Sequence, residues 1–392
     1  MKITEIRTQL YEYELTRPLG DANSPHGRHR ACDLAVMVDT DAGLTGVSIG
    51  NPGAQSLVLS LGQLLVGNDP RGVRGLWKRM VDKVFKGGNE GTANDAIGCL
   101  DVALWDIKAK ANDEPLWKTL GATTRYVDIY ASGIDSPLTD DALRTFYEGM
   151  AARGVSAGKL KVGLDRDADT RRIGIMKDAL TKSGKTPSLM IDSNEYWSPK
   201  QAIRHIRYFE EQFDLTWVEE PARRWDYRGL RQVSQAVRAA VATGENLDDL
   251  SNYMPLVANE AVDVVQIGIG TSGITGAMQV ADLAYAFELP VALMSCPGHF
   301  MGHLAACLPN HWMMEVVDAG QDKALKRDNA IESGQLVLGD SPGIGIEFDK
   351  EILAQHAVVQ PSPGAGASPW GRRRGAGLCE IGPDEPDVLP SE

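Results

Sequence analysis

Four apolar runs in the middle of the chain, each with charged residues at or near its end, constrain the fold most strongly. The charged positions are Lys159 with Lys161, then Asp192, Glu219 and Glu245. From Lys159 onward the steps are 33, 27 and 26 residues, about the length of one strand, one helix and two short loops. Parallel strands that alternate with helices end at one rim, so we expect these side chains to converge there.

Strand-length apolar runs continue through the second part of the chain, and mostly helix-like stretches separate them. The runs cover residues 126–131, 158–162, 188–192, 215–219, 240–244, 262–267, 289–294 and 312–317. Eight strands that alternate with helices favour a closed α/β barrel over an open sheet. We therefore predict a barrel domain over residues 125–350.

The chain before and after this region has a different pattern. Residues 1–50 alternate like antiparallel strands, and the stretch 54–112 has helical periodicity. Together they predict an α+β domain over residues 1–124. The remainder, 351–392, is rich in Gly and Pro and lacks a core pattern, so we expect it to pack back on the first domain.

A polar segment, residues 17–30, separates the first two predicted strands. It is either an ordinary mobile loop or a lid that carries substrate-contacting groups. If it is a lid, its deletion should harm turnover far more than thermal stability.

Composition narrows the class of partner. The net charge of −13 argues against nucleic acid, and three arginines at 372–374 fit a solvated or locally paired tail. No apolar run reaches the length of a membrane span, and the N-terminus does not resemble a signal peptide. The five cysteines are widely spaced without a C-x-x-C pair, which fits reduced thiols in a cytoplasmic protein. We expect a small-molecule ligand and a homo-oligomer.

Lys159 and Lys161 are two residues apart on one predicted strand, so their side chains share a face. Neighbouring ammonium groups lower each other's pKa, and a lysine that is neutral near pH 7 can act as a general base. The alternative is two solvated lysines on an edge strand. Leu160 and Val162 face the other way, which fits a buried strand with a polar inner face.

Asp192, Glu219 and Glu245 provide carboxylate oxygens without a histidine or cysteine among them, a set that suits Mg²⁺. Any one of them could be a helix cap or half of an ion pair. Three such acids at strand ends, after a strand with two lysines, favour a metal site.

The order of these motifs resembles the enolase superfamily, in its mandelate racemase branch. The motifs are K-x-K at 159–161, D-x-N at 192–194, E-E-P at 219–221, G-E-N at 244–246 and a helix at 101–108. The resemblance spans about residues 1–375. It implies a (β/α)7β barrel, a modified TIM barrel, with an N-terminal α+β capping domain. It also implies Mg²⁺ at the strand ends and removal of the proton α to a carboxylate.

The resemblance further implies a role for each residue. Lys161 would be the base and Lys159 its electrostatic partner, while the three acids would bind Mg²⁺. Asn194 would contact the substrate, and Glu315 would hydrogen-bond its carboxylate. This chemistry makes physical sense, because a divalent cation stabilises the negative charge that develops when a weakly acidic α-proton leaves.

The chain departs from the branch pattern at the sixth and seventh predicted strands. Gly268 stands where that branch has Asp and a related branch has Lys. His299 follows the seventh strand slightly later than expected and lacks the usual Asp partner. We predict His299 as the acid on the opposite face, with His303 as a weaker candidate. The alternative is an ordinary loop histidine.

Two other functions compete with this interpretation. Residues 268–273 match G-x-G-x-x-G, and Glu288 follows Gly268 by 20 residues, as an NAD-dependent oxidoreductase would use them. That match is weak, because it falls at the sixth strand of the series. A non-catalytic relative is the other alternative. Within the superfamily we favour an acid-sugar dehydratase over a racemase, epimerase or cycloisomerase, because His299 lacks the carboxylate that would raise its basicity for a two-base racemase.

Overall fold

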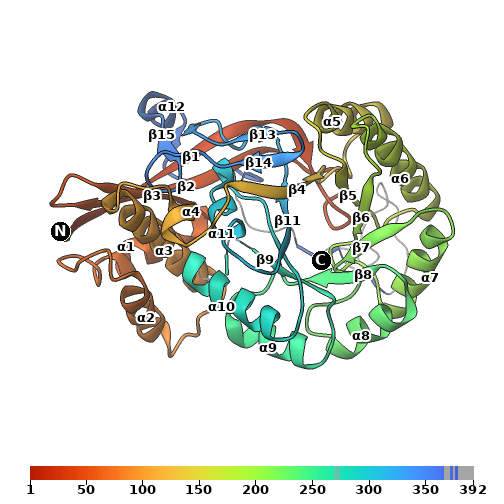
Figure 1. Ribbon diagram of the computed structural model, residues 1–392, viewed down its shortest axis with the longest axis horizontal. Helices are drawn as coiled ribbons and strands as arrows, with labels where there is room; N and C mark the ends of the chain where they lie inside the picture. Colours follow the sequence, from red (N-terminus) through yellow and green to blue (C-terminus); the bar gives the residue numbers. More distant parts are fainter. Residues whose placement is uncertain (269, 272, 366–370, 374–375, 378–392) are drawn as a thin grey trace.

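A closed barrel of parallel strands forms the centre of the molecule in this computed structural model, which describes residues 1–268, 270–271, 273–365, 371–373 and 376–377 (Figure 1). The strands, in order around the barrel, are β4 (Tyr126–Ser132), β5 (Ala157–Lys161), β6 (Ser188–Asp192), β7 (Leu215–Glu219), β8 (Ala240–Thr243), β9 (Val264–Ile267), β10 (Val291–Leu293) and β11 (His311–Val316). Strand β11 pairs with β4 and closes the ring. The predicted (β/α)7β barrel is therefore confirmed.

Helices connect successive strands and surround the barrel (Figure 1). They are α5 (Asp140–Ala152), α6 (Arg166–Thr181), α7 (Pro199–Glu210), α8 (Tyr227–Ala236), α9 (Leu250–Ala258), α10 (Gly273–Ala286) and the short α11 (Gly302–Ala305). Side-chain caps fix where several of them begin. Ser198 and Gln201 form a capping box at α7, and Asp165 accepts two backbone N–H groups at the start of α6. These starts place each preceding loop at the same end of the barrel.

The barrel interior is filled rather than hollow. Tyr130 and Trp217 pack edge to face with ring centroids 5.2 Å apart, within a buried layer that includes Met190. The Lys159 ammonium lies 5.5 Å from the centre of the Tyr130 ring. This apolar layer packs beneath the polar residues at the strand ends.

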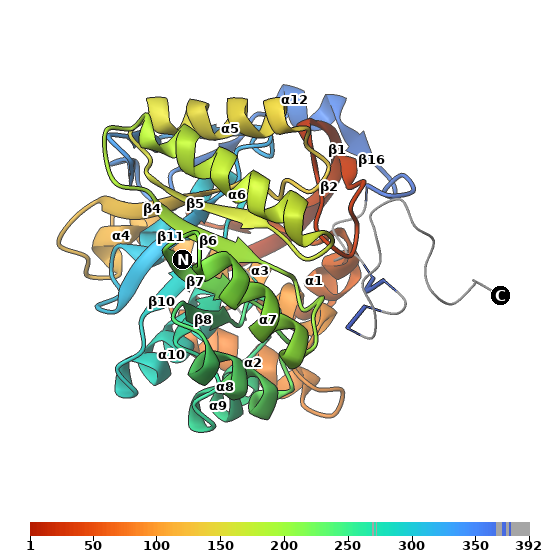
Figure 2. The ribbon, with the colours of Figure 1, turned by 90° about the vertical axis from the view of Figure 1, so that its right-hand side faces the viewer.

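An antiparallel sheet with helices forms the cap, which lies at one end of the barrel (Figure 2). Its elements are β1 (Ile3–Leu19), β2 (Arg28–Thr40), β3 (Thr45–Gly50), η1 (Pro52–Ala54), α1 (Gln55–Gly62), α2 (Val73–Val84), α3 (Thr92–Ala111) and α4 (Leu116–Thr119). Asp101 of α3 fixes the cap to the barrel, because its carboxylate accepts hydrogen bonds from the Thr275 backbone N–H at 2.8 Å and hydroxyl at 2.6 Å. The Asp101 side chain is buried and thus connects the cap helix α3 to the start of α10 in the barrel.

The chain after the barrel returns along both parts. Its elements are β12 (Leu325–Arg327), β13 (Ala330–Glu332), β14 (Gln335–Val337), β15 (Ile346–Phe348), α12 (Lys350–Gln355) and β16 (Ala357–Val358). Strand β16 pairs with the edge of β1. We retain the division at residues 124/125 and 350/351 as a proposal. No described helix is both long and apolar enough to cross a membrane.

The polar segment 17–30 is partly strand and partly a loop that reaches the cavity described below. Strand β1 continues to Leu19 and β2 begins at Arg28, so only a short turn connects them. The guanidinium of Arg17 donates to the backbone carbonyls of Gly133 and Val317. Deleting the segment would also remove strand pairing and this anchor, so we expect stability to fall together with turnover.

Candidate active site

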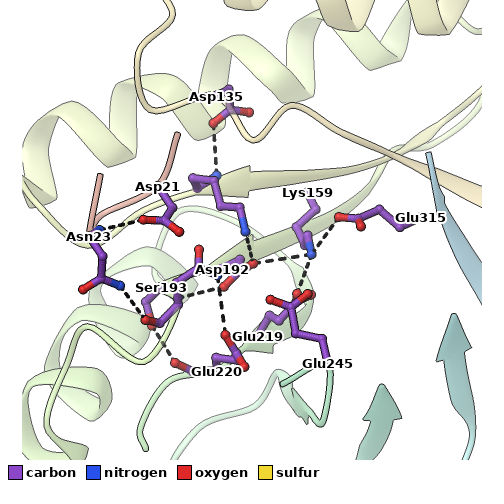
Figure 3. Close-up of polar contacts among 12 residues, drawn as sticks. Asp21, Asn23, Asp135, Lys159, Asp192, Ser193, Glu219, Glu220, Glu245 and Glu315 are labelled. Carbon is purple, nitrogen blue, oxygen red and sulfur yellow. Dashed lines mark hydrogen bonds and ion pairs between the residues drawn. The ribbon is translucent and has the colours of Figure 1, made fainter. Parts of the chain in front are cut away.

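The charged residues at the ends of β5, β6 and β7 meet in one buried cluster (Figure 3). The Lys159 Nζ lies 2.5 Å from a Glu219 oxygen, 3.1 Å from Glu315 and 3.4 Å from Asp192. The Lys161 Nζ lies 2.5 Å from the same Asp192 oxygen. The two lysines therefore share one face of β5, as the spacing predicts, and both contact carboxylates.

The acids Asp192, Glu219 and Glu245 each place one carboxylate oxygen within 4.8 Å of the others. Oxygens bound to one Mg²⁺ at about 2.1 Å lie at most about 4.2 Å apart, so the present spacing is close to what the ion requires. Each oxygen is a hard ligand, and no softer donor is part of this set. The residues therefore fit a magnesium ion.

Electrostatics in this cluster differ from the sequence-based expectation for the lysines. Burial lowers the pKa of Lys161, but Asp192, Glu245 and Glu219 together outweigh it, so the pKa is raised. Lys159 also has a raised pKa, because Glu219 and Glu315 outweigh its burial. Lys159 does lower the pKa of Lys161, but the carboxylates have the larger combined effect, so the expectation of a lysine that is neutral near pH 7 is wrong for this metal-free arrangement.

The acids respond differently to the same charges. Burial raises the pKa of Asp192, yet Lys161 and Lys159 bring it down to about 2. Burial raises the pKa of Glu219 and of Glu245, and the neighbouring carboxylates add to this increase. Such an accumulation of negative charge in a buried site favours binding of a divalent cation.

A cavity of about 420 Å³ opens onto this cluster, with Lys161, Glu245 and Glu315 in its wall. Asn194 also lines it, held at a positive φ of 46° by its backbone N–H, which donates to Asp192 at 2.8 Å. Glu315 accepts a hydrogen bond from the Ser295 backbone N–H at 3.1 Å. The structure thus brings together the residues predicted for the metal, the base and the substrate contacts.

Comparison with known proteins agrees with this geometry. Residues 142–352 match the family described as enolase C-terminal domain-like. Residues 10–121 match the mandelate racemase / muconate lactonizing enzyme N-terminal domain. The chain belongs to the enolase superfamily. The predicted membership is therefore confirmed in its mandelate racemase and muconate lactonizing enzyme group.

Relatives in this superfamily include enzymes that act on acid sugars. A 3,6-anhydro-alpha-L-galactonate cycloisomerase from Streptomyces coelicolor is 32% identical over 91% of this chain and 99% of its own. An L-talarate/galactarate dehydratase from Salmonella typhimurium is 28% identical over 89% and 90%. These relatives support an enzyme of lyase or isomerase type rather than a non-catalytic protein.

Solved structures of similar proteins contain the expected ion. A racemase from Streptomyces coelicolor with bound magnesium superposes with a TM-score of 0.83 and 30% identity, covering 91% of this chain and all of that one. An L-talarate dehydratase from Polaromonas, in complex with Mg and L-glucarate, gives 0.82 and 27%, covering 91% of this chain and 97% of that one.

The histidines lie differently from the other predicted residues. His299 sits in η2 (Pro297–His299), buried at a positive φ of 56°, and is not among the residues that line the cavity. Burial lowers its pKa to about 4, so its imidazole is neutral at pH 7. His303 is buried, and both of its ring nitrogens face backbone groups. Its Nδ1 accepts from the Trp117 backbone N–H at 3.1 Å, and its Nε2 lies 3.1 Å from the Ile344 carbonyl oxygen.

The glycine-rich motif has a packing role. Ile269 and Ser272 of that motif lie outside the described residues. A Cβ at Gly273 would meet the Asp101 carboxylate at 2.6 Å, so this glycine allows the cap helix to approach α10. Glu288 follows the other end of α10, about 20 Å from Gly273 at about 1.5 Å per residue. It cannot serve the same dinucleotide, and the oxidoreductase alternative is wrong.

Several cavity residues were not predicted as site residues. Asp21 and Asn23 come from the turn between β1 and β2, and Arg372 comes from the C-terminal segment. Glu220, next to a metal-ligand candidate, is buried and accepts a hydrogen bond from Asn246 at 2.7 Å. The polarity of segment 17–30 was a sequence signal for Asp21 and Asn23, and the E-E-P motif at 219–221 contains Glu220. Arg372 hydrogen-bonds to backbone carbonyls, which agrees with the locally paired rather than the solvated alternative for the arginine run.

Proposed function

We propose that this chain is a Mg²⁺-dependent dehydratase of an acid sugar, which removes the proton α to a carboxylate and eliminates the β-hydroxyl as water. The observation that carries this proposal is the position of Lys161. Its ammonium contacts the metal-ligand candidate Asp192 and also lines the cavity in which a substrate would lie. The proposed ion, base and substrate space are therefore contiguous.

In this proposal each side chain has one task. When bound at Asp192, Glu219 and Glu245, Mg²⁺ supplies stabilisation of the negative charge on the substrate's enolised carboxylate. Lys161 takes the α-proton at its Nζ. The neutral amine that this step needs is favoured when the charge of the carboxylates is shared with a cation, because Asp192, with Glu245 and Glu219, holds the Lys161 pKa high.

The remaining proposed roles concern position. Lys159 is held between three carboxylates and places positive charge beside the base. Asn194 and Glu315 line the cavity and would hydrogen-bond the substrate. Each of these side chains is fixed by a neighbour before a ligand arrives, which is the preorganisation that proton abstraction needs.

Two groups could return a proton to the departing hydroxyl. His299 is the proposed acid on the opposite face. Its low pKa and its position outside the cavity lining argue against it. Lys161 lies in the cavity and carries the abstracted proton after the first step, so elimination on one face needs no second acid. We therefore propose Lys161 as the donor and retain His299 as the alternative.

Cycloisomerisation is the second candidate function. The similarity to the 3,6-anhydro-alpha-L-galactonate cycloisomerase favours it, because that relative shares 32% of its residues with this chain. Racemases and epimerases share the same first step. The mass of the product separates the dehydratase from the others, because a dehydratase releases one water, whereas a cycloisomerase, racemase or epimerase conserves the mass of the substrate.

The test is a library of acid sugars incubated with the protein and Mg²⁺ and analysed by mass spectrometry and by a keto-acid assay. We expect loss of water and formation of a keto acid. A product of unchanged mass would replace the dehydratase with an isomerase. In D₂O, K161A should abolish exchange of the α-proton, whereas H299N should leave exchange intact. Exchange that survives in K161A would refute the assignment of the base.

Two further features stay proposals. The described cysteines are unpaired, which supports the proposed cytoplasmic location. A homo-oligomer is also proposed, and sedimentation equilibrium would test it.

A further inference from the structure

The C-terminal segment reaches the mouth of the cavity and supplies part of its wall. Arg372 lines the cavity, about 180 positions after the loop that it contacts. Its guanidinium donates to the backbone carbonyl of Glu195 at 3.1 Å and to that of Tyr196 at 3.0 Å. These contacts hold the arginine over the loop that follows β6, beside the proposed substrate.

Neighbouring residues fix this segment in place. The Arg373 backbone N–H donates to the Asn23 side chain at 3.3 Å, and the Asn23 amide donates to the Asn194 carbonyl at 2.9 Å. Ala376 is buried in the main hydrophobic cluster. Asn23 therefore connects the cap, the barrel and the C-terminal segment at one point, and Arg372 is held on a defined backbone.

A second arginine faces the same space. Arg223 lines the cavity and stacks on Trp225, with its guanidinium carbon 5.0 Å from the ring centre. Within the part of the chain that the structure describes, neither Arg223 nor Arg372 forms an ion pair with an acid. Arg224 differs, because it pairs with Glu195 at 2.6 Å. Two cavity arginines thus carry charge that the described residues do not neutralise.

The charges near Arg372 favour an anionic ligand at this position. Burial lowers its pKa and the positive charge of Arg223 lowers it further, against a smaller opposing effect of Glu195, which is already paired with Arg224. Two guanidinium groups that destabilise each other become mutually favourable when an anion lies between them. Arg372 contacts the Glu195 and Tyr196 carbonyls rather than a metal-ligand candidate, so an anion beside it would be distinct from the carboxylate at the metal.

We propose that Arg372 and Arg223 bind a second carboxylate, at the end of the acid sugar remote from the reacting carbon. The substrate is then a dicarboxylic sugar acid, an aldarate, rather than an aldonate. The inference rests on the proposed function, since it extends the same cavity. A volume of about 420 Å³ lies within the ordinary range for a pocket that encloses a small ligand.

The experiment compares an aldarate with the aldonate of the same configuration, using the holoenzyme with Mg²⁺. R372Q should raise KM for the aldarate about ten- to hundredfold, which is the usual worth of a charge-assisted hydrogen bond. It should leave KM for the aldonate unchanged, and R372K should restore part of the loss. R223Q should raise KM for the aldarate in the same way. In the double variant, the increase in KM should be smaller than the product of the two single increases, because both arginines bind one carboxylate.

Arg71 offers a matched control, because it is exposed and pairs with Asp69 outside the cavity. R71Q removes the same charge and should leave both KM values unchanged. If R372Q and R223Q shift the two substrates equally, the inference fails while the dehydratase stands. If wild type turns over no acid sugar, the proposed function fails. Calorimetric titration then tests the arginine pair separately, by comparing the affinity of wild type, R372Q and R223Q for the aldarate. Stronger, Arg372-dependent use of a terminally phosphorylated aldonate would overturn the assignment to a carboxylate.

Discussion

Replacing Lys159 with methionine removes a fully buried ammonium from among three carboxylates. Its contacts with Glu219, Glu315 and Asp192 measure 2.5, 3.1 and 3.4 Å. At an effective dielectric constant of about 20, each contact contributes about 5–7 kcal/mol of attraction. Most of this attraction offsets the cost of burying the ions. Because removing one partner leaves unpaired buried charge, we expect the metal-free protein to lose about 3–5 kcal/mol of unfolding free energy.

Magnesium should reverse much of this loss. The carboxylates of Asp192 and Glu219 contact Lys159 in the metal-free protein, so K159M frees them for the ion. Mg²⁺ at about 100 times its Kd stabilises a folded protein by about 2.7 kcal/mol. We expect this stabilisation to be larger in K159M than in wild type. The assay is urea denaturation with excess chelator and with saturating Mg²⁺.

Lys110 provides the control for this experiment. Its ammonium lies 2.7 Å from the buried carboxylate of Asp106, within the cap helix α3. K110M should also lower stability, but its response to Mg²⁺ should equal that of wild type. The reasoning is refuted if metal-free K159M is as stable as wild type, or if Mg²⁺ stabilises both proteins equally.

Two other perturbations test separate parts of the molecule. The pKa of His303 falls from 6.5 in the unfolded chain to about 4 in the fold, so the unfolded state binds more protons between these values. Stability should therefore fall by about 3 kcal/mol from this residue as the pH drops from 6.5 to 4, and H303N should show a correspondingly smaller loss in acid denaturation. E219Q removes an anionic ligand and should abolish activity while retaining the far-ultraviolet circular dichroism. Its thermal midpoint should no longer rise with Mg²⁺, and a normal rise would remove Glu219 from the metal site.

The features that the sequence predicts well are those that local periodicity determines. Buried parallel strands are continuous apolar runs, so the barrel strands can be placed within a few residues. The spacing of Lys159 and Lys161 alone puts them on one face, and the regular steps to Asp192 put the carboxylate at the same rim. Such patterns need no knowledge of distant contacts.

The features that the sequence does not predict depend on residues far apart in the chain. Asn23 and the segment around Arg372 meet through folding, and no local pattern links positions about 350 residues apart. Strand pairing overrides the polar composition around Arg28, because neighbouring strands decide whether such a segment is extended. The pKa of Lys161 likewise depends on how close Asp192 lies, which spacing cannot give.

The glycine at the end of β9 offers a last test, because the branch pattern has a carboxylate there. A Cβ at Gly268 would lie 2.7 Å from the backbone carbonyl oxygen of Glu245, too close for a side chain without movement of that backbone. G268A should therefore shift a metal-ligand candidate. We expect Mg²⁺ affinity to fall about 10–100-fold, as for other changes that move a ligand indirectly. Calorimetric titration of Mg²⁺ measures this. A Cβ at Gly174 in α6 would meet no atom within 4 Å, so G174A should leave the affinity unchanged. If G268A binds Mg²⁺ with normal affinity, steric exclusion of a side chain does not explain why this position lacks the Asp of the branch pattern.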